Sequence, residues 1–132
     1  MTKLSASSKV YVDSSKITGA GRGVFAKCDI SKDDVIESCP IIEISKHDAS
    51  TLNESSLVTY IFYFGKAKER LAVTLGFGSL YNHSYKPNAT FNIKGKEQLI
   101  DFVALTNIKK DTEITFNYKH DSANISPLWF EV

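Results

Sequence analysis

Short β-prone segments separated by turn residues fill most of this chain and restrict its fold more than any other feature. They combine β-branched and aromatic residues with glycine-, proline- or lysine-rich turns. The segments are residues 10–13, 23–26, 35–38, 41–44, 57–64, 71–75, 90–93, 98–105 and 113–118. Only the window 47–58 favours a short helix, with Asp48 or Ser50 as its cap. This pattern predicts a mostly-β fold with one short helix or 3-10 segments.

The length of 132 residues and the 42% hydrophobic content fit one compact domain. Residues 1–9 are polar and rich in serine and lysine, so we expect a flexible N-terminus there. Residues 10–132 are expected to form the single domain. Within it, about 45–72 is an insert region and 119–132 a C-terminal flanking segment.

Composition argues against several classes of function. The net charge of +1 disfavours a protein built mainly to hold phosphate backbones. No stretch reaches transmembrane length and no signal pattern opens the chain, so we expect a soluble, intracellular protein, cytoplasmic if prokaryotic. Cys28 and Cys39 are too few for a disulfide framework, and the three histidines lack metal-ligand spacing. We therefore expect no metal and no direct nucleic-acid partner.

A glycine-rich segment, GAGRGVF at residues 19–25, is the first of three clusters that carry chemistry. Glycines let a backbone turn tightly and approach a ligand closely. The segment lacks the GxGxxG spacing of a dinucleotide site and the lysine of a phosphate-binding loop. By itself it is better explained as an ordinary glycine turn.

The second cluster, GFGSLYNHSYKPN at residues 76–88, places Asn82 and His83 at the end of an apolar run. An asparagine amide both donates and accepts hydrogen bonds, so it can hold an amine or a carboxylate. The alternative is that Asn82, Ser84 and Asn88 only satisfy the backbone of their own turn.

The third cluster, EITFNY at residues 113–118, alternates as a strand does and carries Tyr118 at its end. A tyrosine in this place is commonly a packing residue with one satisfied hydroxyl. Taken alone, it does not identify a function.

Together and in this order, the three clusters resemble the SET-domain family. GRGVFA (21–26) is similar to its first motif, NHSxxPN (82–88) to its second and EITFNY (113–118) to its third. The resemblance covers about residues 17–118 and is closest to the short, stand-alone viral and bacterial type, in which LGFG (75–78) is typical. It implies a β-clip fold of several small curved sheets, with a C-terminal pseudoknot that brings the second and third motifs together.

The resemblance also implies an activity: S-adenosylmethionine-dependent transfer of methyl groups to a protein lysine. Its roles fall on matching positions. Tyr118 is the catalytic tyrosine. The cofactor-binding residues are Gly21, Arg22, Gly23, Tyr81, Asn82 and His83, with Asn82 at the amino-acid end and the His83 backbone at the adenine. The substrate-lysine channel is lined by Tyr60, Phe91, Phe116 and Trp129.

The chemistry suits these residue types because the cofactor brings an activated methyl group and the protein must align a neutral amine with it. A free lysine with a pKa near ~10.4 is almost entirely charged at neutral pH. A narrow aromatic channel disfavours that charge. Phe91 and Phe116 occupy positions where a tyrosine in the family limits the product to one methyl group, so we expect di- or trimethylation.

Alternatives remain at this stage. A non-catalytic peptide- or cofactor-binding module can use the same fold. Trp129 and Phe130 either close the channel or pack on the surface, and His120 borders the site or lies in an exposed turn. The expected partner is a lysine-containing protein or peptide, for which histone tails are a common family target. A homodimer is also compatible with the resemblance.

Overall fold

In the computed structural model, residues 3–66 and 69–118 are described. Their elements are β1 (Val10–Ser14), β2 (Arg22–Ala26), β3 (Val35–Ile44), α1 (Lys46–Asn53), the 3-10 helix η1 (Ser56–Tyr60), β4 (Phe62–Phe64), β5 (Arg70–Thr74), β6 (Asn82–His83), β7 (Ala89–Lys94), β8 (Leu99–Ala104) and β9 (Glu113–Phe116). The prediction of a mostly-β fold with a short helix and a 3-10 segment is confirmed. Trp129, His120 and the rest of 119–132 lie outside the described residues.

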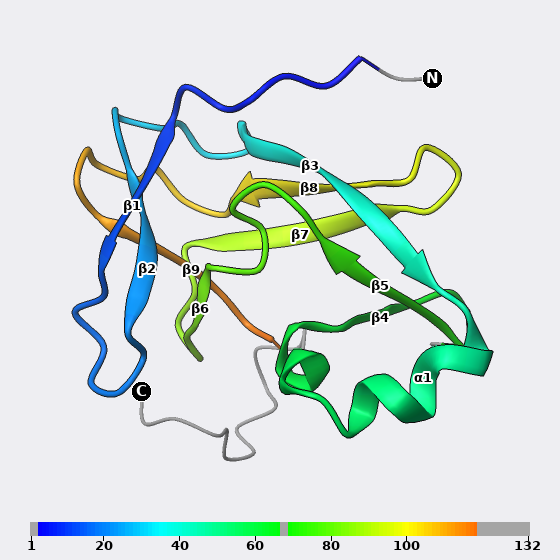
Figure 1. The fold of residues 1–132 in the computed structure, drawn as a ribbon. Coiled ribbons are helices and arrows are strands. Elements are labelled where there is room, and N and C mark those ends of the chain that lie inside the picture. The colour runs from blue at the N-terminus through cyan, green and yellow to red at the C-terminus, as the bar shows by residue number, and fades with distance from the viewer. Residues whose placement is uncertain (1–2, 67–68, 119–132) are drawn as a thin grey trace.

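The strands form two sheets (Figure 1). One has the order β1-β2-β9-β6 and the other the order β4-β5-β3-β8-β7. All pairs within these sheets are antiparallel except β6 with β9, which is parallel. This parallel pair joins the second and third sequence clusters, which is the contact that the expected pseudoknot requires.

Strand β3 corrects one expectation, because residues 35–38 and 41–44 belong to a single strand rather than two. Residues 35–40 pair with β8, whereas residues 41–44 pair with β5. Pro40 therefore lies where the strand changes partners, and its missing N–H removes no bond from the middle of one ladder. Its carbonyl still accepts a hydrogen bond from the Leu75 N–H at 2.9 Å.

The segment 45–64 also differs from the prediction. The helix is shorter than 47–58, its N-cap is Ser45 rather than Asp48 or Ser50, and no side-chain capping bond forms. The predicted strand 57–64 begins only at Phe62, because η1 occupies its first half. Neither α1 nor η1 contains a buried residue, so propensity for a strand at 57–61 was not reinforced by burial.

Aromatic side chains build the centre of the core. Phe102 on β8 is fully buried, stacks on Tyr81 at 4.5 Å between ring centroids, and contacts Phe116 on β9 at 5.4 Å. The two sheets are thus joined through residues of the second and third clusters. Within the described ranges, no helix is long and apolar enough to cross a bilayer. The division into flexible end, insert and flanking segment stays a prediction.

Candidate active site

The parallel pairing of β6 with β9 places Tyr118 beside the second cluster. Asn82 is in register with Thr115, and His83 with Phe116. The Tyr118 N–H donates to Nδ1 of His83 at 3.0 Å, and the Tyr118 hydroxyl donates to the Tyr81 carbonyl at 2.7 Å. Tyr118 is thus held at its backbone by His83 and at its side chain by Tyr81, the residues on either side of Asn82.

The Asn82 amide joins all three clusters. Its Nδ2 donates to the Arg22 carbonyl at 3.0 Å and to Oε2 of Glu113 at 2.9 Å, and the residue is buried. Both amide hydrogens are therefore directed at protein acceptors. The alternative in which Asn82 serves only its own turn is wrong, because its partners lie on β2 and β9.

Asn88 is likewise not a local turn residue. Its Nδ2 donates to the Glu113 carbonyl, and its Oδ1 accepts from the Thr115 N–H, each at 2.9 Å. A side chain that makes both bonds replaces a backbone partner for β9. The NHSxxPN segment is therefore attached to β9 at both of its ends.

Replacing Asn88 by alanine should lower the free energy of unfolding by about 1–3 kcal/mol, because it leaves a strand donor and acceptor without their partner. Urea denaturation measures this change. Asn92→Ala, at an exposed position on β7, is the control and should change the free energy by less than about 0.5 kcal/mol. Equal stabilities of the two variants would contradict the attachment.

Gly23 of the first cluster faces this junction. A Cβ added to the buried Gly23 would collide with Oε2 of Glu113 and lie 3.0 Å from Nδ2 of Asn82. Gly21 has a φ of 77°, a conformation that favours glycine, and a Cβ there would meet nothing within 4 Å. Gly23 thus permits close packing, whereas Gly21 and Arg22 are exposed at the point where β2 begins.

Glu113 has more bonds here than the sequence suggested. Besides Asn82, its carboxylate accepts from the Ser15 hydroxyl at 2.8 and 2.9 Å and from the Lys16 N–H at 3.2 Å. Glu113 therefore connects Ser15 and Lys16, which precede the glycine-rich segment, to Asn82. The motif contained Glu113, but only the three-dimensional contacts reveal this link, because Ser15 and Lys16 lie outside every motif.

Phe91 and Phe116, two of the expected lysine-channel residues, pack together beside Tyr118, whereas Trp129 lies outside the described residues. The Phe116 ring is 5.2 Å from both the Tyr118 and the Phe91 rings, measured between centroids. Phe62, which was not among the residues expected to line the channel, stacks on Phe116 at 5.9 Å. Tyr60 is 39% exposed, so it lies at the outer edge of this group.

Burial raises the pKa of the Tyr118 phenol above its ordinary value, and the charges of Tyr60 and Glu113 raise it further. A raised pKa means that the protonated phenol persists to higher pH than for a free tyrosine. Tyr118 is therefore a hydrogen-bond donor to Tyr81 throughout the neutral range, not a base.

Tyr81, one of the expected cofactor residues, is 1% exposed. Its ring stacks on Phe102, and its hydroxyl donates to Glu37 at 2.8 Å. The side chain is thus enclosed by protein. His83 is fully buried as well.

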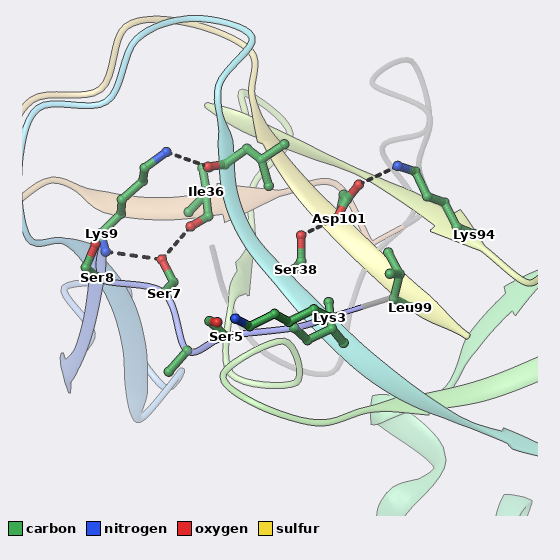
Figure 2. A pocket seen from close by; sticks show the side chains of 13 residues that line it. Lys3, Ser5, Ser7, Ser8, Lys9, Ile36, Ser38, Lys94, Leu99 and Asp101 are labelled. Carbon is green, nitrogen blue, oxygen red and sulfur yellow. Dashed lines mark hydrogen bonds and ion pairs between the residues drawn. The ribbon is translucent and has the colours of Figure 1, made fainter. Parts of the chain in front are cut away.

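A groove of about 450 Å³ lies elsewhere, beneath the N-terminal segment (Figure 2). It includes Ser38 and Asp101, a cross-strand pair on β3 and β8, and the Ser38 hydroxyl donates to Asp101. Glu37 and Phe102, the adjacent pair, point to the opposite face of these strands, where Tyr81 lies. The groove and the junction around Tyr118 are therefore separate, and no expected site residue lines the groove. No cluster of potential metal ligands occurs among residues 3–66 and 69–118.

Comparison with known proteins identifies relatives of the chain. The SET domain family model matches residues 21–119. A Schizosaccharomyces pombe protein named histone-lysine N-methyltransferase, H3 lysine-37 specific, is 30% identical over 112 residues, covering 84% of this chain and 71% of the relative.

Solved structures agree with this match. A Plasmodium falciparum protein assigned as a histone methyltransferase has a TM-score of 0.66 and 33% identity, covering 86% of this chain and 95% of its own. A Chaetomium thermophilum polycomb repressive complex 2, autoinhibited and bound to S-adenosylmethionine, has a TM-score of 0.73. It is 24% identical over 91% of this chain and 16% of that one, which is a likeness of fold alone.

Proposed function

The chain belongs to the SET-domain family of protein-lysine methyltransferases, and from this membership we propose that it methylates a histone lysine to the di- or trimethylated state. The observation that carries the proposal is the convergence of Tyr118, Asn82 and Gly23 at the junction of β9, β6 and β2. The names of the fission-yeast and Plasmodium relatives support the choice of a histone.

SET domains take the methyl group from S-adenosylmethionine, which supplies an already activated methyl carbon when bound. The residues present fit this group. Because both Asn82 amide hydrogens are directed at protein acceptors, its carbonyl oxygen is what the side chain offers a ligand. An acceptor suits the ammonium at the amino-acid end of the cofactor. Gly23 brings the β2 backbone to the same place without a side chain in between.

We assign Tyr118 the task of orienting the substrate amine. Its hydroxyl hydrogen is directed at the Tyr81 carbonyl, so the phenol oxygen presents lone pairs to the channel in a fixed direction. Tyr60, Phe62, Phe91 and Phe116 line that channel in the proposal and exclude water from the amine. A desolvated lysine favours its neutral, nucleophilic form, and fixed alignment lowers the barrier further.

Turnover should rise with pH as the substrate lysine loses its proton, and Tyr118 should impose no falling limb below about pH 10. The sign follows from the raised pKa: at a pH where a free phenol begins to ionise, Tyr118 is still protonated and still donates to Tyr81. Initial rates between neutral pH and about pH 10, with stability checked by circular dichroism, test this. A fall in rate within that range would contradict this expectation under two conditions. The protein must remain folded, and its ultraviolet spectrum must show a phenolate that the spectrum of Tyr118→Phe lacks.

The state of methylation depends in this proposal on the two phenylalanines. Phe116→Tyr or Phe91→Tyr adds a hydroxyl that can hold water in the channel. Either variant should therefore shift the product toward monomethyl-lysine. Mass spectrometry of a histone peptide after long incubation measures the product distribution. A wild-type enzyme that stops at one methyl group would contradict the proposed di- or trimethylation.

Incubation of the chain with histones and isotopically labelled S-adenosylmethionine tests the proposal. We expect label on a histone lysine with the wild type and a strong loss with Tyr118→Phe and Asn82→Ala. Tyr11→Phe, which alters an exposed hydroxyl bonded to Asp111, is the matched control and should label normally. Label on other proteins only would reject histones, and no label in a whole proteome would favour a binding module.

A further inference from the structure

We propose that Glu37, which lies outside all three motifs, is a positioning residue for Tyr118: it anchors the Tyr81 side chain and thereby fixes the carbonyl that accepts the Tyr118 hydroxyl. The inference rests on the catalytic role proposed for Tyr118. It deepens the proposed function because it extends the site to a strand, β3, that carries none of the expected residues.

The first step is the position of the carboxylate. Glu37 is 7% exposed and pairs across the strands with Phe102, so both side chains face Tyr81. The two ion pairs among the described residues involve other acids, Glu43 and Asp101. A buried carboxylate is costly unless hydrogen bonds satisfy it, and an apolar residue would fill this space at less cost. From its burial and its satisfied hydrogen bonds we infer that Glu37 has a positional task.

The second step is the pair of donors that the carboxylate holds. Oε1 accepts from the Tyr81 hydroxyl at 2.8 Å, and Oε2 accepts from the Phe77 N–H at 3.1 Å. Gly76, with a φ of 63°, lies so near that an added Cβ would be 2.9 Å from Oε2. One carboxylate thus holds both ends of the segment 77–81, which leads directly into β6.

The third step is the path from Tyr81 to Tyr118. The Tyr81 ring is fixed by Phe102 at 4.5 Å and by the bond to Glu37, so its backbone has little freedom. Its carbonyl accepts the Tyr118 hydroxyl at 2.7 Å. A shift of the Tyr81 side chain moves this carbonyl, and with it the phenol oxygen that we assign to the substrate amine.

The test compares Glu37→Gln and Tyr81→Phe. Both keep the packing, but glutamine has only one carbonyl oxygen for two donors, and phenylalanine removes the donor altogether. The direct measurement is the ¹³Cζ resonance of Tyr118 in tyrosine-labelled protein, identified among the six tyrosines by Tyr118→Phe. We expect this resonance to move in both variants and kcat to fall about tenfold, while the Kd for S-adenosylhomocysteine changes less. The double variant should be no worse than the more impaired single variant, because both break one link.

Glu43→Gln is the matched control, since Glu43 is on the same strand but pairs with Arg70 at the surface. It should leave the Tyr118 resonance and kcat unchanged. An unmoved Tyr118 resonance in Tyr81→Phe, or in a folded Glu37→Gln protein, would overturn the inference. This measurement needs no substrate, so a wild-type chain without transferase activity would reject the proposed function and still leave the Glu37 result decisive.

Discussion

Tyr118→Phe is expected to lower kcat by about 10²-fold or more while the Kd for S-adenosylmethionine stays within a few-fold of the wild type. The variant keeps the ring between Phe116 and His83 but loses the hydroxyl that the Tyr81 carbonyl orients. Alignment of the amine is then lost, whereas the contacts of Asn82 and the glycine loop are not.

Single-turnover kinetics with a histone substrate and calorimetry with the cofactor separate these two effects. Tyr11→Phe again serves as the control, because its hydroxyl bonds Asp111 at the surface and its loss should change neither quantity. Weakened cofactor binding with an unchanged rate of transfer would contradict the role given to Tyr118.

Gly23→Ala should weaken cofactor binding by about 10- to 100-fold. The new methyl group would collide with Glu113 and press on the Asn82 amide, so both side chains must move. Because Glu113 also bonds Ser15 and Lys16, a displacement of its side chain also reaches the residues just before the glycine-rich segment. Overpacking of this kind costs about 1–3 kcal/mol of stability as well.

Calorimetric titration and urea denaturation of the same samples measure both consequences. Gly95→Ala, in the turn between β7 and β8, is the matched control. Its Cβ would approach the Phe64 ring and the Arg70 guanidinium, which is the end of a flexible side chain. It should retain wild-type affinity. Wild-type affinity in Gly23→Ala would show that the Glu113–Asn82 contact does not shape the cofactor site.

The strand content followed from local sequence, because β-branched and aromatic runs between turn residues indicate strands wherever the partner lies. What the sequence could not supply was the choice of partner. Pro40 looked like a boundary between two strands, yet it marks the place where one strand leaves β8 for β5. Likewise, Phe62–Phe64 forms a strand only where it pairs with β5, and the residues before it form η1 instead.

The site could be anticipated as far as the motifs reach. Asn82, Gly23 and Tyr118 were singled out from sequence clusters, and their proximity could not be derived from spacing alone. Glu37 and Phe62 were not assigned to the site, since a glutamate in a strand and a phenylalanine in an apolar run usually have surface or core roles. Their significance depends on contacts across 44 residues of chain, from Glu37 to Tyr81, and between Phe62 and Phe116.

A titration of ¹⁵N-labelled protein with S-adenosylhomocysteine, followed by NMR, tests the central claim that three distant segments form one cofactor site. We predict that the largest amide shifts occur together at Gly21, Gly23, His83 and Tyr118, with one dissociation constant, and that Ser5 and Lys9 in the groove of Figure 2 do not shift. Shifts confined to that groove, or none at saturating ligand, would contradict it.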